Sequence, residues 1–429
     1  MIREFWAENF YSIKERQVLN FESKGARDAF SNSIIDEKTR INKLEILYGA
    51  NASGKSNVLY ALQTVFKLLI VPRHEKTEKV IGYRPFAMTN DQPVSLFVSF
   101  YANHVKYDYT ITYSRQFILS ETLFYYPNGS KSLFYKREFL SKDRAASIVF
   151  GQSLGITKKA EDVFISNTLN NHSVLSTVIK TSFEDSIDPL KMLHEWIVNH
   201  VHDINGDNKE SISFTDTIKE VCENPKMKSF YLQMIKKADF NIVDFNYIET
   251  DRNISERVRK QIQQDPDLPE KVKQMILEGK AQDILFTSKV ADNTFELKSS
   301  AQSSGTIEFM QRLRFLYDTI SGEHIYFLDE PEEDLHYDLF LFYLNAFLYN
   351  SSESQIIMAS HLTTLLSEEL INENRDLVFF VEKDINSAAS SYTRGDKFGL
   401  HKRLSLYNAY RIGRLGAKPE LGSPFVLSD

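Results

Sequence analysis

The segment GANASGKS at residues 49–56 contains the residue types that hold a nucleotide phosphate. It fits the spacing G-x-x-x-x-G-K-[ST] and lies between the apolar stretch LEILY and a helix-like pattern. The loop amides can surround phosphate oxygens, while a lysine adds positive charge and a serine hydroxyl can bind Mg²⁺. The segment therefore predicts a site for ATP and Mg²⁺. We expect nucleotide contacts from Gly49, Asn51, Ala52, Ser53, Gly54, Lys55, Ser56 and Asn57, with Ser56 also a metal ligand.

A second candidate, HIYFLDE at residues 324–330, is an apolar strand pattern that ends in two carboxylates. Ligands of open α/β sheets bind at the carboxyl ends of strands. Asp329 would hold Mg²⁺, and Glu330 would orient or deprotonate the water that attacks the γ-phosphate. The other interpretation is a strand that ends in solvated acids. The phosphate loop upstream favours the catalytic interpretation.

The segment QIIMASH at residues 355–361 repeats this arrangement one strand–helix unit further along the chain: an apolar strand pattern ends in Ser360 and His361. His361 could donate a hydrogen bond to the γ-phosphate and so distinguish ATP from ADP. A single histidine at the start of a helix is more often structural. Its position after the acidic strand favours a catalytic role.

The segment SSAQSSGT at residues 299–306 precedes a helix-like apolar stripe. Serine and threonine are common N-caps, because their hydroxyls accept the unpaired amides of a first helical turn. An ordinary cap is therefore one interpretation. The other is an anion site at a helix entrance, and the remaining motifs must decide between them.

The composition is that of a globular protein: 429 residues, 42% hydrophobic and 13% aromatic, are enough for the cores of two or three domains. The net charge of −7 gives no general basic field, so nucleic-acid binding is unsupported, although a local basic patch is not excluded. The single cysteine, Cys222, excludes an internal disulfide and a multi-cysteine metal site. Apolar runs are too short to span a bilayer, which predicts a cytoplasmic protein without membrane contact.

The order of elements predicts an α/β fold in which an insertion splits a nucleotide-binding core. Residues 1–140 would form the first half, with the phosphate loop and an antiparallel β meander over 83–137. Residues 141–290 read as a mostly helical insertion that includes a charged hairpin, broken at DPDLP and extending to residue 282. Residues 291–429 would form the second half, in which we expect helices over YDLFLFYLNAFLY and HLTTLLSEEL.

The motif order GANASGKSN, QSSGT, FLDEPEEDLH and MASH resembles the ABC-type ATPase heads of transporters, SMC proteins and the OLD-like family. It resembles more closely the compact bacterial AAA branch with ABC architecture that occurs in phage-defence systems such as PARIS. The segments ENFYSIKERQVLNF, YRPF and YNAYRIGRLGAKP also resemble that branch. The resemblance covers both halves of the head and becomes thin over residues 140–285.

The resemblance implies a P-loop head whose signature loop caps the γ-phosphate bound to another protomer, and hence a homo-oligomer. Ser303 and Gly305 match the signature serine and glycine, and Asp334 matches the acidic D-loop position. The leading Leu-Ser-Gly-Gly order of transporters is absent, so the hydroxyl that contacts phosphate stays open. No Q-loop glutamine stands out among Gln92, Gln116 and Gln152.

For function, the resemblance implies a Mg²⁺-dependent ATPase that acts as sensor or scaffold for a separately encoded effector, a nuclease or toxin, after a phage-derived trigger. One alternative is an SMC-like DNA-binding repair ATPase. Another is an OLD-like ATPase with its own nuclease, because LVFFVEKD resembles a Toprim strand with Glu382 and Asp384 as metal ligands. Fewer than fifty residues follow Asp384, without a second strand that ends in paired acids, which favours a solvated strand end.

Overall fold

The computed structural model describes residues 1–418 except for a set of short segments. These are residues 25–29, 36–38, 142–145, 204–212, 239, 252–254, 266–272, 274–276, 278–279, 334 and 402. The chain divides into two compact units. Unit 1 comprises Met1–Asn205, Gly322–Pro331 and Leu348–Asp429, and unit 2 comprises Gly206–Ser321 and Glu332–Phe347. Among the described residues, no helix has the length and apolar content needed to cross a membrane.

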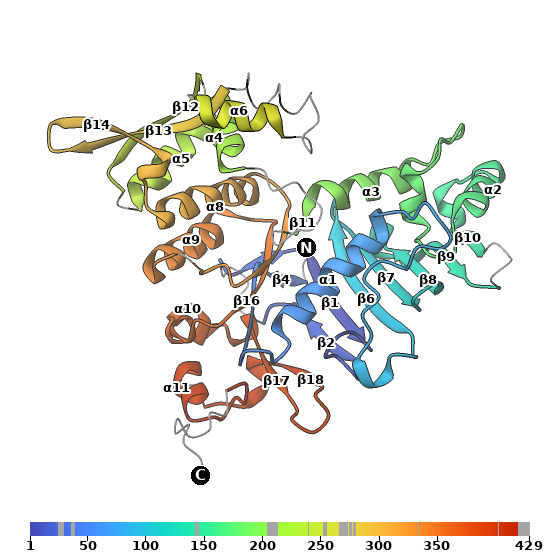
Figure 1. Cartoon of the computed structure of the whole chain (residues 1–429). Helices are drawn as coiled ribbons and strands as arrows, with labels where there is room; N and C mark the ends of the chain where they lie inside the picture. Colours follow the sequence, from blue (N-terminus) through green and yellow to red (C-terminus); the bar gives the residue numbers. More distant parts are fainter. Residues whose placement is uncertain are drawn as a thin grey trace, which may run out of the picture. The chain divides into compact units, whose positions relative to one another are not determined.

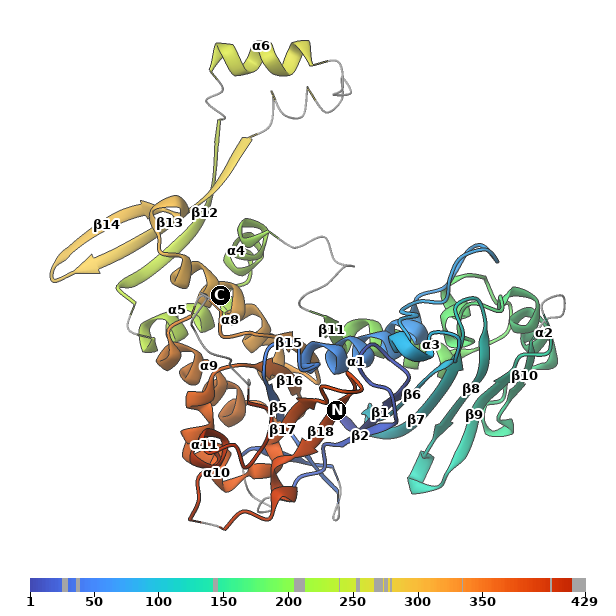
Figure 2. The ribbon, with the colours of Figure 1, turned by 60° about the horizontal axis from the view of Figure 1, so that its bottom comes forward.

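Unit 1 contains a six-stranded sheet whose four central strands are parallel (Figure 2). The strand order is β11 (Val201–Asp203), β15 (Ile325–Asp329), β16 (Gln355–Ser360), β5 (Leu44–Gly49), β17 (Val378–Lys383) and β18 (Ser390–Arg394). β11 is parallel to β15, and β18 closes the other edge antiparallel to β17. The central strands are mostly apolar and largely buried, as expected for parallel strands that are covered on both faces, with Glu45 of β5 as a buried exception.

Helix α1 (Lys55–Ile70) packs between this sheet and a second one (Figure 1). It contacts β5, β15 and β16 of the parallel sheet and also β1 and β6 of the antiparallel sheet. Buried apolar side chains surround much of the helix, in agreement with a helix packed between two layers. The helix ends where Val71 becomes extended before Pro72, a residue that disfavours helical conformation in its predecessor.

The second sheet of unit 1 has seven antiparallel strands in the order β10-β9-β8-β7-β6-β1-β2. Their bounds are β1 (Ile2–Glu8), β2 (Gln17–Asn20), β6 (Val94–Ala102), β7 (Val105–Tyr113), β8 (Ile118–Tyr125), β9 (Ser132–Glu138) and β10 (Ser147–Phe150). The predicted α/β fold with an antiparallel β subdomain is confirmed. β1 lies beside β6 through long-range antiparallel pairing, and β2 pairs with β1 at the edge of the sheet.

The remaining elements of unit 1 are short. They are β3 (Asn32–Ile34), β4 (Arg40–Asn42), α2 (Lys158–Asn167), α3 (Asp188–His200), α10 (Glu369–Glu373), α11 (Leu406–Arg411) and the 3₁₀ helices Ala87–Thr89, Pro127–Gly129, Gln152–Leu154, Leu175–Ile179, Thr363–Ser367, Arg375–Leu377 and Gly395–Phe398. The elements between residues 147 and 203 thus belong to unit 1. The three-segment division at residues 140 and 290 stays a prediction.

The helix expected over HLTTLLSEEL is instead a 3₁₀ turn followed by the short helix α10. Glu368 is extended between the two. The Asn372 side chain donates to the carbonyl oxygens of Leu366 and Glu368, at 3.0 and 2.9 Å. Side chains that bond locally to the backbone compete with continuous helix, which accounts for the break.

Unit 2 contains helices and a three-stranded antiparallel sheet. Its elements are α4 (Phe214–Glu223), α5 (Pro225–Lys237), β12 (Ile242–Asp251), α6 (Glu256–Gln264), β13 (Lys280–Val290), β14 (Asn293–Lys298), a 3₁₀ turn (Ser299–Ala301), α8 (Ser304–Ser321) and most of α9 (Tyr337–Asn350). The predicted YDLFLFYLNAFLY helix corresponds to α9. The sequence did not indicate this sheet, and the helix predicted to extend to residue 282 was wrong over residues 280–282, which belong to β13.

The buried pattern of β13 explains that error. Ile284, Phe286 and Ser288 are buried at alternate positions, which is the period of a strand and not of a helix. Charged and polar residues before them masked this alternation in the sequence. α6 confirms the first helix of the predicted charged hairpin, and most of the second lies outside the described residues.

A fully buried ion pair fixes the antiparallel sheet to the segment that covers α1. The Arg137 guanidinium on β9 and the Glu121 carboxylate on β8 are 3.7 Å apart, and neither side chain is exposed. Arg137 also donates to the carbonyl oxygens of His172 and Leu169, at 2.5 and 3.0 Å. Burial raises the pKa of Glu121, and the Arg137 charge opposes that shift. The segment held in this way leads into the 3₁₀ turn Leu175–Ile179, which contacts α1.

We expect Arg137→Met to destabilise the protein by about 3–5 kcal/mol, because it leaves the Glu121 carboxylate buried without its cation. Lys136→Met is the control, since Lys136 pairs with Glu138 where both side chains are about half exposed. That surface pair contributes at most about 1 kcal/mol. Urea unfolding followed by circular dichroism measures both losses. Equal losses would show that the buried pair does not stabilise the sheet.

Candidate nucleotide-binding site

The carboxyl ends of four parallel strands lie side by side in the six-stranded sheet. In the pairing register, Val381 is opposite Gly49, Ser360 is opposite Tyr48, and Asp329 is opposite Ala359. The ends of β5, β17, β16 and β15 are therefore neighbours, although they come from segments far apart in the sequence. Crevices at the carboxyl ends of the strands are the usual ligand sites of open α/β sheets.

The predicted phosphate loop follows β5 and leads directly into α1. Ala52 and Gly54 have positive φ angles of 61° and 110°, which turn the backbone back toward the helix. The Lys55 ammonium donates to the carbonyl oxygens of Gly49 and Ala50, at 3.1 and 3.3 Å. Its side chain is buried within the loop, where incoming phosphate oxygens would compete with these carbonyls for the charge.

Residues from two other segments support the back of this loop. Ser390 Oγ lies 2.5 Å from the carbonyl oxygen of Ser53 and 2.7 Å from Ser12 Oγ. The Tyr392 hydroxyl donates to the carbonyl oxygen of Gly54 at 2.8 Å. Both Ser390 and Tyr392 belong to β18, which lies beside β17 in Figure 2. The loop conformation is therefore held by tertiary contacts as well as by its own sequence.

A cavity of about 510 Å³ opens at the carboxyl ends of these four strands. Its lining consists of Asn51, Ala52, Ser53, Gly54, Lys55, Ser56, Asn57, Glu330, His361 and Lys383. The structure thus brings the phosphate loop together with both residues predicted to be catalytic. Gly49 ends the strand that precedes the loop and is outside this lining.

Glu330 and His361 face each other in the cavity. His361 Nδ1 and Glu330 Oε1 are 3.5 Å apart, and the side chains are 48% and 34% exposed. The Glu330 amide donates to the carbonyl oxygen of Ala359 at 3.0 Å, which ties the end of β15 to β16. Both side chains can therefore reach a water molecule or a phosphate in the cavity. This geometry suits a general base paired with a hydrogen-bonding histidine.

Asp329 and Ser56 are the predicted ligands of Mg²⁺. Asp329 Oδ1 is buried and has no hydrogen-bond partner among the described residues. The Ser56 hydroxyl is on the first turn of α1 and lines the cavity. Oxygen atoms of these two kinds suit Mg²⁺. No group of three or more His, Cys, Asp or Glu side chains able to hold a metal occurs within the described residues, so phosphate oxygens and water would complete the ion's shell.

The predicted signature residues belong to unit 2. Ser303 Oγ accepts a hydrogen bond from the Thr306 amide at 3.1 Å, so it caps α8. Gly305 lies in the first turn of that helix. The cap agrees with the ordinary interpretation and is equally compatible with a role in phosphate binding. Asp334 lies outside the described residues, and nucleotide contacts by all three residues stay predictions.

Of the two candidate nuclease residues, Glu382 is exposed at the end of β17, and Asp384 has structural contacts. Asp384 Oδ1 accepts hydrogen bonds from the Ser387 amide and hydroxyl at 2.6 and 2.7 Å, and from the Asn386 amide at 3.1 Å. The Ser387 hydrogen bonds lower the pKa of the Asp384 carboxyl. Asp384 therefore caps the turn between β17 and β18, which supports a solvated strand end.

Four residues at the cavity or the loop were not predicted from the sequence: Lys383, Ser12, Ser390 and Tyr392. Lys383 could have been found, because it is the last residue of an apolar strand, as Asp329 is, and lines the same cavity as His361, which directly follows one. The other three gave no signal, since their function depends on contacts with a loop far away in the sequence.

Comparison with known proteins finds a family model that matches part of the chain. Residues 46–191 match the family model described as "AAA domain, putative AbiEii toxin, Type IV TA system". This part of the chain is similar to an AAA-type ATPase domain. The match contains the phosphate loop, α1 and most of the antiparallel sheet. No curated protein matches the chain significantly.

Among solved structures, the SMC head domain from Thermotoga maritima is 12% identical with a TM-score of 0.39, covering 92% of this chain and 98% of that one. An SMC head bound to the C-terminal winged-helix domain of ScpA is 13% identical with a TM-score of 0.41, covering 96% and 99%. An SMC head with extended coiled coil, bound to a ScpA domain derived from Pyrococcus furiosus, is 13% identical with a TM-score of 0.38, covering 96% and 98%.

We expect Gly54→Ala to weaken ATP binding at least about tenfold, because its φ of 110° is strained for alanine and its Cβ would lie 2.3 Å from Ser390 Oγ. Gly129→Ala is the control. Gly129 also has positive φ, but an added Cβ would meet nothing within 4 Å. It should cost about 1 kcal/mol of stability and leave ATP affinity unchanged. Calorimetry measures both affinities, and undiminished binding by Gly54→Ala would contradict the loop geometry.

Proposed function

We propose that this chain is a Mg²⁺-dependent ATPase that hydrolyses ATP in the cavity at the phosphate loop. The observation that carries the proposal is the convergence of Lys55, Glu330, His361 and Lys383 on one cavity. Two ammonium groups there offset phosphate charge, and a carboxylate faces the same space. A site that only bound nucleotide would not need this carboxylate.

The proposed reaction assigns one role to each side chain. Lys55 and Lys383 bind phosphate oxygens and offset the charge that develops during phosphoryl transfer. Glu330 accepts a proton from the water whose oxygen attacks the γ-phosphorus, while the bond to the β–γ bridging oxygen breaks and ADP leaves. His361 hydrogen-bonds the γ-phosphate. Ser56 and Asp329 would hold Mg²⁺, which supplies charge neutralisation at the β- and γ-phosphates.

The proposal includes a composite site in which Ser303 and Gly305 of one protomer contact the nucleotide of another. Ser303 is exposed at the start of α8, an 18-residue helix whose amides and dipole favour an anion. A homo-oligomer that assembles on ATP follows from such a site. The motif order that resembles ABC-type heads supports this arrangement, and Asp334 would lie near the same boundary.

For the biological role, we propose a cytoplasmic sensor or scaffold of anti-phage defence. ATP-dependent assembly would control a separately encoded effector, a nuclease or toxin, in response to a phage-derived trigger. Two observations support this choice: the resemblance of the motifs to that branch, and the family match, whose description names a putative AbiEii toxin of a type IV toxin–antitoxin system. A single cysteine, Cys222, fits a reducing compartment.

We expect Glu330→Gln to bind ATP with nearly unchanged affinity and to hydrolyse it at least about a hundredfold more slowly, since the amide cannot accept the proton from water. The variant should accumulate as an ATP-bound oligomer. Glu369→Gln, at an exposed position of α10, is the control and should hydrolyse ATP normally. Phosphate release and size-exclusion chromatography give the two results. Normal turnover in Glu330→Gln would remove Glu330 from the mechanism.

The composite site predicts complementation between two inactive variants. Ser303→Arg should bind ATP through Lys55 but fail to hydrolyse it, and Lys55→Ala should fail to bind it. A mixed dimer contains one interface with both defects and one with neither, so mixing should restore part of the activity.

The control is Ser213→Arg, because Ser213 caps α4 with a hydrogen bond from the Asp216 amide at 3.1 Å. Losing either cap costs about 1 kcal/mol, so a purely structural Ser303 should behave like Ser213. Ser303→Arg protein that hydrolyses ATP at the wild-type rate would refute the shared site.

A further inference from the structure

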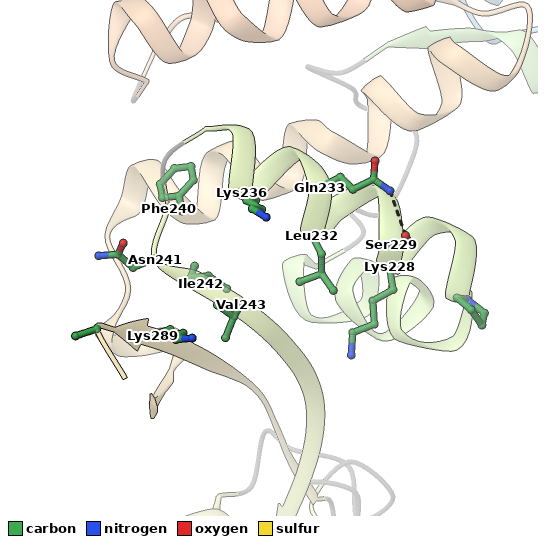
Figure 3. A pocket seen from close by; sticks show the side chains of 12 residues that line it. Lys228, Ser229, Leu232, Gln233, Lys236, Phe240, Asn241, Ile242, Val243 and Lys289 are labelled. Atoms are coloured by element: carbon green, nitrogen blue, oxygen red, sulfur yellow. Dashed lines mark hydrogen bonds between the residues drawn. The ribbon is translucent and has the colours of Figure 1, made fainter. Parts of the chain in front are cut away.

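A groove of about 780 Å³ in unit 2 lies between α5 and the start of β12 (Figure 3). One wall is a stripe of α5 at helical spacing, including Lys228, Leu232 and Lys236. The other wall consists of residues 240–243, with Lys289 and Ala291 from the end of β13 and the turn after it. The groove runs along the exposed side of α5, because Met227, Tyr231, Met234 and Ile235 are buried on its other side.

The walls of the groove are fixed by backbone contacts. The Phe240 amide donates to the carbonyl oxygen of Ile235 at 3.3 Å, and the Lys289 amide donates to that of Asn241 at 2.8 Å. The Phe240 ring packs against Phe309, with ring centroids 5.5 Å apart. The end of α5, the start of β12 and the end of β13 are thus held together, so the groove exists before any ligand arrives.

Apolar side chains form the middle of the groove. Leu232 on the helix and Ile242 and Val243 on the strand line it in Figure 3. Val243 is 47% exposed, and Leu232 is partly exposed. A ligand that covered these side chains would remove apolar surface from water, which favours binding by about 25 cal/mol per Å².

The charge of the groove is of one sign. Its lining contains three lysines and no Asp or Glu, in a chain whose net charge is −7. Lys228 is 2.9 Å from Asp244 Oδ1 and donates to Asn246 Oδ1 at 2.9 Å. Lys236 and Lys289 have no ion pair with any described side chain. Lys236 also suits the C-terminal end of the α5 dipole, but Lys289 lies on a strand and has no such explanation.

We propose that this groove binds an acidic peptide segment of a protein partner, with an apolar side chain against Leu232 and Val243 and carboxylates at Lys236 and Lys289. The α5 stripe from residue 225 to residue 236 is about 16 Å long at 1.5 Å per residue. That length matches about five residues of extended chain. The inference rests on the proposed function in one respect, because the peptide would belong to the effector that the ATPase controls.

Two features favour carboxylates over nucleic-acid phosphates. The first amides of α5 are already capped, since Asn224 Oδ1 accepts from the Lys226 and Met227 amides, each at 3.2 Å. The groove also offers little for base stacking, because its lining contains no arginine and a single aromatic side chain, Phe240, which packs against Phe309. An oligonucleotide is therefore an alternative outcome of the test.

The test uses the full chain and fluorescence anisotropy with labelled ten-residue peptides. The probe set has the pattern EELLFEDLEE, with Leu, Phe or Met at the apolar positions. Two comparison peptides replace either all acidic residues with lysine or all apolar residues with serine. We expect at least one acidic, apolar peptide to bind, and both comparison peptides to bind at least about tenfold more weakly.

The double variant Lys236→Glu/Lys289→Glu should weaken peptide binding at least about tenfold, and Val243→Asp should have a similar effect. Lys237→Glu is the matched control, because Lys237 is an exposed residue of the same helix that does not line the groove. It should change affinity less than about twofold. All these variants should hydrolyse ATP as the wild type does, and Lys55→Ala should still bind the peptide.

Absence of binding by every probe at about 1 mM would overturn the proposal. So would an equal effect of Lys237→Glu. If a ten-nucleotide thymidine strand binds more tightly than the peptides, with the same dependence on Lys236 and Lys289, the groove serves nucleic acid instead. Peptide binding without any ATP hydrolysis would refute the proposed function alone, whereas hydrolysis without peptide binding would refute the groove alone.

Discussion

The parallel register of β5, β15, β16 and β17 is the constraint on which the candidate site depends. Backbone hydrogen bonds between these strands place Gly49, Asp329, Ser360 and Val381 near one edge of the sheet. A shift of two residues in any strand would move its terminal polar groups by about 6.6 Å, more than the reach of a hydrogen bond. The apolar residues within the strands fix the register, since a shifted strand would move buried apolar side chains to its solvent-accessible carboxyl end.

The phosphate loop adds a second constraint, because its shape is set from behind as well as from within. Glycine is the only residue type that fits at position 54, because the backbone has a positive φ there and a Cβ would collide with Ser12 and Ser390. Ser390 and Tyr392 come from β18, the antiparallel edge strand next to β17. A strand from the second half of the sequence thus supports a loop from the first half. The conformation of the phosphate loop therefore depends on β18 remaining in place beside β17.

The sequence alone predicted the parts of the site whose information is local. The loop at residues 49–56 and the polar ends of two apolar strands could be found because each motif lies within one continuous segment. Lys383 follows the same rule, because it ends the apolar strand β17, but it was not predicted.

Ser12, Ser390 and Tyr392 could not be predicted, since only tertiary folding brings them to the loop. Ser303 shows a different limit, because a helix cap and a phosphate ligand require the same residue at the same place. In unit 2, the strands β12 and β13 were not predicted, because charged residues hid their two-residue period.

The central claim is that the carboxyl ends of the parallel strands form an ATP site. ATP affinity measured by calorimetry, in wild type and in Lys383→Ala, tests this claim most directly. The account predicts that Lys383→Ala binds ATP at least about tenfold more weakly, while Lys397→Ala, at an exposed site beyond β18, binds normally. Equal affinities in all three proteins, or no ATP binding by the wild type, would contradict a nucleotide site at this edge.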